Sequence, residues 1–319
     1  MASAANKKFL AISGGVGGAK LVLGLSRCLA TGQLSIVANT GDDFRHHGLH
    51  ISPDLDTVMY TLAALNDTER GWGLASESWN FLAALETLGG ETWFRLGDRD
   101  LATHIQRSQL LAEGHTLSQV TRRLCQQLGV QYPLWPMSDD EVSTVVHTGE
   151  GALPFQHYFV RRQCEPAVTG FEFAGIDAAR PQPDFMAQLA SSDLSGVIIC
   201  PSNPFVSVDP ILGLPGVRQA LRECKAPVIA VSPIVAGMAI KGPAAKMMAE
   251  LGVPVTALAV AQHYQGVIDC FVVDESDAKL AASIEQLGMT VAVSSTIMKT
   301  LAEREALASA IIELAESAR

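Results

Sequence analysis

A glycine-rich turn between an apolar run and a helical pattern is the feature that most constrains this chain. The run Phe9–Ser13 predicts a buried strand, the turn Gly14-Gly-Val-Gly-Gly18 follows, and leucines recur through Ala19–Ala30 as in a helix packed on a sheet. A second apolar run, Ser35–Asn39, completes a βαβ unit. Such a unit places two parallel strands side by side, and its glycines let the backbone come close to a bound anion.

The same alternation of apolar runs and helical patterns returns in the C-terminal half. The predicted strands are Gly196–Cys200, Ala226–Val231, Val255–Val260, Cys270–Val273 and Thr290–Val293. The predicted helices are Gly216–Glu223, Ala244–Leu251, Asp277–Leu287 and Leu301–Ala318. Strands separated by helices at this spacing indicate an α/β protein with a Rossmann-like, doubly wound and mainly parallel sheet.

Between these two regions the pattern is helical. The spacing of apolar residues predicts helices over Thr57–Leu65, Ser76–Leu88, Asp100–Glu113 and Ser118–Leu128. We therefore expect residues 51–139 to form a helical insertion within a nucleotide-binding domain made of residues 1–50 and 140–319. Two more strands are predicted just after the insertion, at Thr144–His147 and Phe155–Arg162.

Composition excludes several classes of protein. The chain carries a net charge of −10, which argues against a general electrostatic grip on nucleic acid or on an anionic membrane. No uncharged apolar run reaches the length of about 18 residues that a membrane span needs. The six cysteines are scattered without a CxxC pair, and Met1–Lys8 is a short polar leader, so we expect a cytoplasmic protein with free thiols.

The glycine turn is the first candidate site. Backbone N–H groups at the start of a helix, together with the helix dipole, bind phosphate groups, so we expect Gly14, Gly15, Gly17, Gly18 and Lys20 to hold one. The turn is not a P-loop, because that motif requires serine or threonine after the lysine, and it lacks the third glycine of a dinucleotide fingerprint. The alternative is a turn that needs glycine only for packing.

Acidic residues follow the second predicted strand and form the second candidate site. They are Asp42, Asp43, Asp54 and Asp56. Because ligands of such sheets lie at the strand ends, these carboxylates suit Mg²⁺ bound together with substrate phosphates. The alternative for Asp54 or Asp56 is capping of the helix that follows. The histidines between the two acidic pairs, His46, His47 and His50, lack a metal-binding spacing and indicate a solvated loop.

Further polar loops extend this pattern. Arg95 and Arg99 surround a glycine turn, where a planar or phosphorylated ligand would find guanidinium groups. The acidic pair Asp139-Asp140 belongs either to the same site or to a turn. Ser202 and Asn203 lie between two prolines at a predicted strand end, where their side chains would contact a base or sugar.

The ordered set of these motifs resembles a known family. The motifs are Ser13-Gly-Gly-Val-Gly-Gly-Ala-Lys20, Asn39-Thr-Gly-Asp-Asp43, Ser52-Pro-Asp-Leu-Asp-Thr57, Leu96-Gly-Asp-Arg-Asp-Leu-Ala-Thr-His104, Pro136-Met-Ser-Asp-Asp140, Pro201-Ser-Asn-Pro204 and Lys241-Gly-Pro243. Together they resemble the 2-phospho-L-lactate transferase family of coenzyme F420 biosynthesis. The resemblance covers the chain from about residue 9 to residue 274.

The resemblance implies a Mg²⁺-dependent transferase. Such enzymes move a phospholactyl, phosphoenolpyruvyl or phosphoglyceryl group from a guanosine diphosphate-activated donor to Fo, a deazaflavin. The acceptor is the terminal hydroxyl of the ribityl chain of Fo, and the products are an F420 precursor without glutamates and GMP. The resemblance also implies a Rossmann-like fold with a helical insert, which forms part of the deazaflavin site, and a homodimer.

Site residues follow from the resemblance, position by position. Asp56 and Arg95 would contact Fo, and Asp54 and Asp56 would be catalytic. Asp43, Asp54 and Asp56 would bind the metal, the four glycines of the turn would hold the diphosphate, and Ser202 and Asn203 would contact the guanosine. From these roles we expect Asp56→Ala to abolish turnover and to leave thermal melting nearly unchanged.

The chain departs from the family pattern in two places, and two alternative functions stay open. Cys200 stands where the family often has glycine, and the pair Asp42-Asp43 is often absent from archaeal members, so the transferred acid stays open. The first alternative is a regulator that resembles the gluconeogenesis-factor proteins and binds a nucleotide sugar. The Leu96–His104 motif and the tryptophans of the insert, Trp72, Trp79 and Trp93, favour the transferase over it. The second alternative is a nicotinamide-dependent oxidoreductase. Only the glycine turn supports it, and Asp42 would then contact the ribose of the cofactor.

Overall fold

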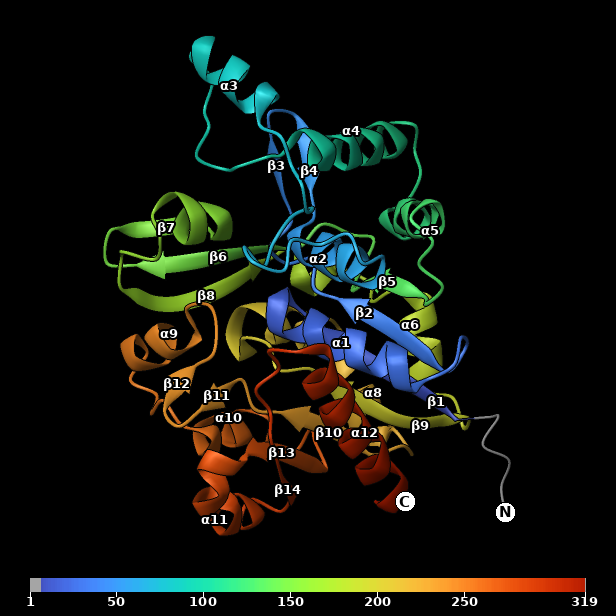
Figure 1. Ribbon diagram of the computed structural model, residues 1–319. Helices are drawn as coiled ribbons and strands as arrows, with labels where there is room; N and C mark the ends of the chain where they lie inside the picture. The colour runs from blue at the N-terminus through green and yellow to red at the C-terminus, as the bar shows by residue number, and fades with distance from the viewer. Residues whose placement is uncertain (1–6, 319) are drawn as a thin grey trace.

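A seven-stranded parallel sheet forms the centre of the computed structural model, which describes residues 7–318 (Figure 1). Its strand order is β14-β13-β10-β9-β1-β2-β5. The strands are β1 (Lys8–Ser13), β2 (Leu34–Ala38), β5 (Leu134–Pro136), β9 (Leu194–Ile199), β10 (Val228–Val231), β13 (Cys270–Asp274) and β14 (Thr290–Ser294). The predicted doubly wound α/β fold is therefore confirmed. Most of the polar leader, residues 1–6, lies outside the described residues.

Helices cover both faces of this sheet because its strands are apolar on both sides. In β1, Leu10 and Ile12 face one core, and Phe9 and Ala11 face the other. The second of these cores is closed by α1 (Gly15–Cys28), α2 (Pro53–Leu62), α4 (Asp98–Ala112), α5 (Leu117–Gln127) and α12 (Leu301–Ser317). The first is closed by α6 (Pro183–Leu189), α7 (Asp209–Gly213), α8 (Val217–Glu223), α9 (Ala244–Glu250), α10 (Ala257–His263) and α11 (Ala281–Glu285).

The helical region between β2 and β5 is a crossover connection. It starts with the hairpin β3 (Phe44–His46) and β4 (Leu49–Ile51), and it includes α3 (Asn80–Thr87), which projects from the body and has no buried residue (Figure 1). The segment predicted as an insertion, 51–139, also contains β5, which pairs with β2 in the central sheet. The sheet thus resumes before residue 140. A three-residue strand, β5, is too short to give a clear apolar run.

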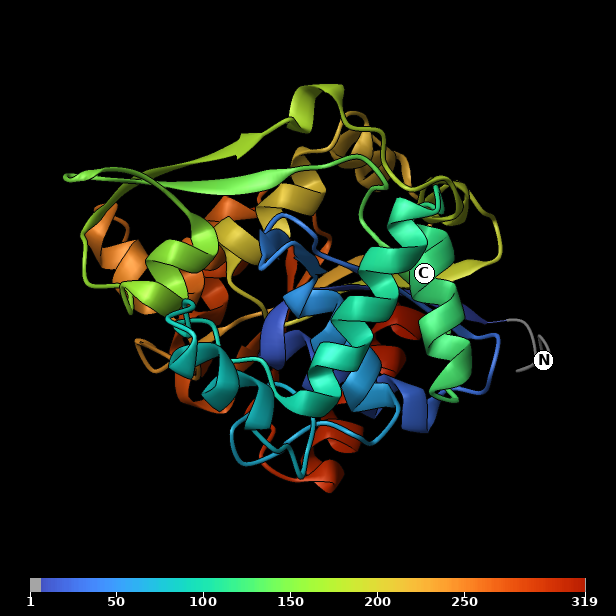
Figure 2. The same ribbon diagram turned by 90° about the horizontal axis from the view of Figure 1, so that it is seen from above.

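A small antiparallel sheet extends to one side of the molecule (Figure 2). Its strands are β6 (Ser143–Thr148), β7 (Gly151–Pro154) and β8 (Val168–Ala174). The strand predicted at Phe155–Arg162 is wrong, because His157–Arg161 forms a π-helical turn that buries Tyr158. The strand predicted at Val255–Val260 is also wrong, because the Thr256 hydroxyl accepts a hydrogen bond from the Ala259 N–H and starts α10.

Shorter elements complete the fold. They are a 3₁₀ turn at Ile176–Ala178, a π-helical turn at Pro204–Val208, the hairpin β11 (Ile234–Val235) and β12 (Met238–Ala239), and a 3₁₀ turn at Glu275–Leu280. Within residues 7–318, no helix is both long enough and apolar enough to cross a membrane.

The strand order predicts where a ligand binds. β1 pairs with β2 on one side and with β9 on the other, so the connections leaving β1 and β9 run in opposite directions across the sheet. In open α/β sheets, ligands lie at such a switch point, outside the carboxyl ends of the strands. The glycine turn follows β1, and the Pro201–Pro204 loop follows β9, so both lie at this point.

Candidate active site at the strand ends

The glycine turn packs tightly against the loop that follows β9. The Ser202 hydroxyl donates to the Gly14 carbonyl oxygen at 2.7 Å and accepts from the Gly14 N–H at 3.2 Å. A Cβ atom on Gly17 would overlap the carbonyl oxygen of Pro201, and one on Gly18 would overlap the Ser13 hydroxyl. Gly15 has a φ of +64°, which glycine adopts without strain. Glycine is therefore required here for packing, as well as for any approach of a ligand to α1.

Replacing Gly17 with alanine tests this packing. The new Cβ atom meets backbone rather than a flexible side chain, so the turn or the Pro201 peptide must move. We expect the free energy of unfolding to fall by about 1–3 kcal/mol, measured by urea denaturation. Gly149→Ala is the matched control, because a Cβ atom there has open space around it. Equal stability of Gly17→Ala and Gly149→Ala would contradict a packing requirement for glycine at position 17.

Asn39 joins two buried carboxylates where β2 ends. Its side-chain amide donates to Asp42 at 3.2 Å and to Asp54 at 3.0 Å, and the Gly15 N–H donates to the other oxygen of Asp54 at 2.6 Å. Burial raises the pKa of Asp42 well above its usual range, and the charges of Asp54 and Asp43 raise it further. Burial also raises the pKa of Asp54, to about 6. A cation or a proton would stabilise this group of carboxylates.

Asp43 lies beside this group and has a free oxygen. Its Oδ2 atom accepts from the Ser52 hydroxyl at 2.6 Å and contacts the His50 Nε2 atom at 3.1 Å. Its Oδ1 atom is buried and has no hydrogen-bond partner within the described part of the chain. Burial raises the pKa of Asp43, although the contacts of His50 and Ser52 oppose this effect.

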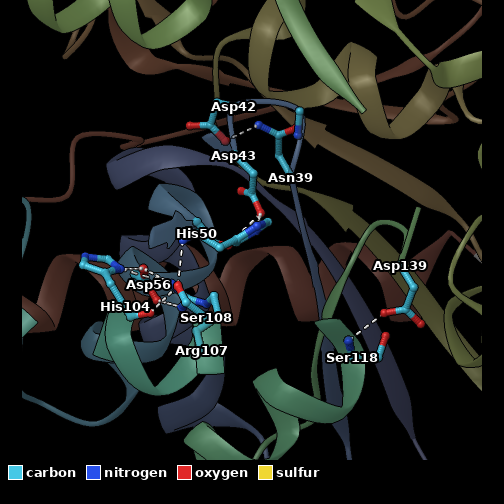
Figure 3. A network of polar contacts seen from close by, with 12 residues as sticks. Asn39, Asp42, Asp43, His50, Asp56, His104, Arg107, Ser108, Ser118 and Asp139 are labelled. Atoms are coloured by element: carbon cyan, nitrogen blue, oxygen red, sulfur yellow. Dashed lines mark hydrogen bonds and ion pairs between the residues drawn. The ribbon is translucent and has the colours of Figure 1, made fainter. Parts of the chain in front are cut away.

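Asp56 belongs to a separate ion pair (Figure 3). Both of its oxygens accept from the guanidinium of Arg107, one of them at 3.0 Å from Nη1. Arg107 is only 1% exposed, and His104 Nδ1 lies 3.7 Å from the Asp56 carboxylate. Burial lowers the pKa of Arg107, but the charge of Asp56 outweighs this effect and raises it. The expectation that Asp56→Ala leaves melting unchanged therefore has to be revised.

Of the three carboxylates predicted to bind Mg²⁺, only two have a suitable arrangement. Asp43 and Asp54 supply hard oxygen donors, and the unpartnered Oδ1 atom of Asp43 suits a cation. Both oxygens of Asp56 are engaged by Arg107, so the structure does not bring the predicted set Asp43, Asp54 and Asp56 together. Among residues 7–318, no group of three or more potential ligands is placed to hold a metal. Mg²⁺ commonly takes only one or two carboxylates and completes its shell with phosphate oxygens and water.

The predicted cationic residues Arg95 and Lys20 lie on two different segments, the loop before α4 and helix α1. Arg95 stacks on the indole of Trp79, with its guanidinium carbon 4.3 Å from the ring centroid. Arg70 lies 5.2 Å from the ring centroids of both Trp72 and Trp79, and these two rings meet edge to face. Lys20 lines a pocket beside α1. The insert therefore presents aromatic rings and guanidinium groups side by side.

Several other predicted residues have local structural partners. The Asn203 side-chain oxygen Oδ1 accepts from the Phe205 N–H at 3.0 Å, and the side-chain amide donates to Met247 Sδ at 3.2 Å. Asp139 accepts from the Ser118 N–H at the start of α5 (Figure 3), and Asp140 pairs with Arg180. The Arg99 side chain donates to the Ala75 carbonyl. These contacts stabilise turns and helix ends.

The histidine loop is less solvated than predicted. His46 is 6% exposed, and its ring lies 5.0 Å from that of Trp93 and 4.0 Å from that of His47. Burial lowers the pKa of His46 to about 4, so it is neutral at pH 7. The prediction of a solvated loop is wrong for His46, because aromatic residues from the insert cover the β3–β4 hairpin.

Three residues of this region were absent from the predicted site, namely Asn39, His104 and Arg107. Asn39 stood within a quoted motif, but its role depends on carboxylates on two different segments. His104 and Arg107 lie on α4 at the same face as Asp100, a polar stripe at helical spacing. That stripe within a predicted amphipathic helix was the available signal.

Comparison with known proteins assigns the chain to a family. The sequence profile described as 2-phospho-L-lactate transferase CofD matches residues 9–310. The chain belongs to this 2-phospho-L-lactate transferase family. Among similar proteins, the phosphoenolpyruvate transferase of Kitasatospora aureofaciens is 39% identical over 98% of this chain and 99% of its own. The 2-phospho-L-lactate transferase of Methanosarcina mazei is 37% identical over 94% of this chain and 98% of its own.

A solved structure agrees with the fold of this family member. A protein of the UPF0052 family from Bacillus halodurans superposes with a TM-score of 0.63, over 97% of this chain and 100% of its own. At 13% sequence identity this likeness shows the fold alone. Family membership supports the transferase class over the regulator and the oxidoreductase.

Proposed function

We propose that this protein transfers a phospho-acid group from a guanosine diphosphate-activated donor to the ribityl hydroxyl of Fo, giving GMP and an F420 precursor. The observation that carries the proposal is the junction of the glycine turn with the carboxylates of Asp42 and Asp54, which Asn39 joins; the Gly15–Asp54 hydrogen bond makes this junction. A diphosphate at the start of α1 would thus lie next to the carboxylates that handle the acceptor hydroxyl. Membership of a family of phospholactate and phosphoenolpyruvate transferases supports this reaction.

The donor would bind at the switch point between β1 and β9. Backbone N–H groups in the first turn of α1 and the positive end of its dipole would bind the diphosphate. Ser202 holds this turn against the β9 loop, and Asn203 orders the backbone beside it, so both would position the guanosine part. Mg²⁺, held by Asp43 and Asp54, would offset the negative charge of the phosphates when bound.

The reaction replaces one phosphorus–oxygen bond with another. The oxygen of the Fo hydroxyl would form a bond to the phosphorus that carries the acid, while the bond from this phosphorus to the bridging oxygen breaks. GMP then leaves as a phosphate ester, which is a stable anion and needs no proton. The hydroxyl proton would pass to a buried carboxylate, for which Asp54 is the candidate, because it accepts a hydrogen bond from Gly15 at the start of α1 and its pKa is about 6.

The acceptor would bind against the helical insert. Arg95, the Trp79 ring on which it stacks, and the Trp72 ring beside Trp79 present flat apolar and cationic surfaces that suit a deazaflavin ring. Asp56, bound by Arg107, would accept a hydrogen bond from Fo only with an oxygen lone pair that the guanidinium leaves free. The homodimer and the cytoplasmic location stay predictions.

A direct assay tests the proposed function. We expect purified protein with Mg²⁺, Fo and a lactyl, phosphoenolpyruvyl or glyceryl donor to release GMP and a phosphorylated deazaflavin, detected by chromatography and mass spectrometry. Removal of Mg²⁺ with a chelator should stop the reaction, and added Mg²⁺ should restore it. Fluorescence of Fo, titrated with protein, reports acceptor binding separately. Absence of product with all three donors would refute the proposal.

A further inference from the structure

A pocket lined by cationic and hydroxyl side chains lies beside the first two turns of α1, in the angle between α1, α2 and the start of α12. Its polar side chains are Lys20, Thr57, Thr61, Asn66, Thr68 and Arg304. Among these described residues none is acidic, and two are cations. The composition of the pocket therefore suits an anion that accepts several hydrogen bonds.

The two cations of the pocket are not paired with a carboxylate in the described part of the chain. Within residues 7–318, neither Lys20 nor Arg304 forms an ion pair, and the Nε atom of Arg304 is buried without a hydrogen-bond partner. Burial lowers the pKa of Lys20, and the charges of Arg304 and Lys241 lower it further. The neighbouring Glu303 is occupied, because its carboxylate accepts the backbone N–H groups of Lys299 and Thr300. A bound anion would relieve this repulsion between like charges.

The outer wall of the pocket is an ordered loop. Asp67 accepts from the backbone N–H groups of Glu69 and Arg70 at 3.0 and 2.8 Å and pairs with the Arg70 side chain. Lys241 donates to the Arg70 carbonyl at 3.2 Å, and a Cβ atom on Gly71 would overlap its amine. Lys241 therefore rests on this wall and adds a third positive charge next to the pocket.

The pocket shares helix α1 with the diphosphate site proposed above, because Val16 and Lys20 both line it. Val16 directly follows Gly15 at the start of α1, and Lys20 lies one turn further along the same helix, a rise of about 5–6 Å. A ligand whose phosphate lies at the first turn of α1 would reach Lys20 with a group only a few bonds away. Lactyl, phosphoenolpyruvyl and glyceryl donors all carry a carboxylate within a few bonds of the phosphorylated oxygen.

We propose that this pocket binds the carboxylate of the transferred acid, through Lys20 and Arg304, with Thr61 as a hydrogen-bond donor. This inference rests on the proposed function. An Arg guanidinium binds a carboxylate through two parallel hydrogen bonds, and Lys20 adds a point charge. The two residues thus distinguish a phospho-acid from a plain phosphate, and they recognise the part that all three donors share.

Binding of small probes tests the pocket without turnover. Phosphoenolpyruvate and inorganic phosphate are titrated by calorimetry, with Mg²⁺ present, into wild type, Lys20→Met, Arg304→Met and Arg304→Lys. We expect both methionine variants to bind phosphoenolpyruvate about 10- to 100-fold more weakly and to bind phosphate nearly as wild type does. Arg304→Lys, which keeps the charge, should recover part of the loss. Arg27→Met is the control, because it removes an exposed charge from the same helix.

The outcomes separate the two proposals. Unchanged phosphoenolpyruvate binding in folded Lys20→Met and Arg304→Met would overturn the carboxylate pocket, while GMP formation by wild type would still support the transferase. An equal loss of phosphate and phosphoenolpyruvate binding would assign the pocket to phosphate and overturn the carboxylate assignment. Selective loss of phosphoenolpyruvate binding, with no GMP formed by wild type, would support the pocket and refute the transfer reaction. Thermal melting of each variant shows that it is folded.

Discussion

Asp56→Ala is expected to lower the free energy of unfolding by about 3–5 kcal/mol, because it leaves the buried charge of Arg107 without a partner. Arg107 is 1% exposed, and both of its terminal nitrogens donate to Asp56. His104, which also contacts this guanidinium, does not replace the lost negative charge. Urea denaturation of wild type and variant at pH 7 measures the difference.

A double mutant shows whether the ion pair is the cause. Asp56→Ala combined with Arg107→Met removes both charges, so it should be more stable than Asp56→Ala alone and should show a coupling energy between the two sites. A single variant that unfolds at the same urea concentration as wild type would contradict a structural role for Asp56. In that case loss of turnover in Asp56→Ala would again point to a direct contact with Fo.

The second large effect is expected for Asp54→Asn, with a fall in kcat of about 100- to 10,000-fold. Asparagine keeps an oxygen for the Gly15 N–H but removes the negative charge next to the glycine turn. Both proposed tasks of Asp54, holding Mg²⁺ and accepting the hydroxyl proton, require the carboxylate. The rate of GMP release at saturating Fo and donor measures the loss.

The fold of this variant should survive. The side-chain amide of Asn39 loses one acceptor, which costs about 1 kcal/mol, and its contact with Asp42 remains. Asp193→Asn is the matched control, since it removes the same charge from an exposed ion pair. Asp193 pairs with Lys8, which begins β1, whereas the glycine turn follows the other end of this strand. Turnover of Asp54→Asn within threefold of the Asp193→Asn control would exclude Asp54 from the reaction.

Most of the fold could be predicted from local sequence patterns. The β1–α1–β2 unit and the strands β9, β10, β13 and β14 follow from apolar runs interrupted by glycine or proline. The patterns failed where a short apolar run fits a strand and a helix equally well. At Val255–Val260 the Thr256 cap decided for a helix, and at Phe155–Arg162 the burial of Tyr158 accompanies a π-helical turn.

The meeting of the candidate-site loops was also predictable, because strand ends and a glycine turn are features of the chain itself. Gly14, Ser202 and Asp54 meet at the switch point between β1 and β9, as parallel strands require. The order of motifs along the chain was enough to indicate the family that the profile match then confirmed.

Only the tertiary structure decided what each side chain in that site is free to do. Asp54 and Asp56 are two residues apart on one helix, yet Asp54 meets Asn39 and the start of α1, while Asp56 meets Arg107 on a helix from another part of the crossover. Lys20 acquires its neighbour Arg304 from the last helix of the chain. The charge and pKa of such groups depend on partners distant in sequence, and packing alone brings those partners together.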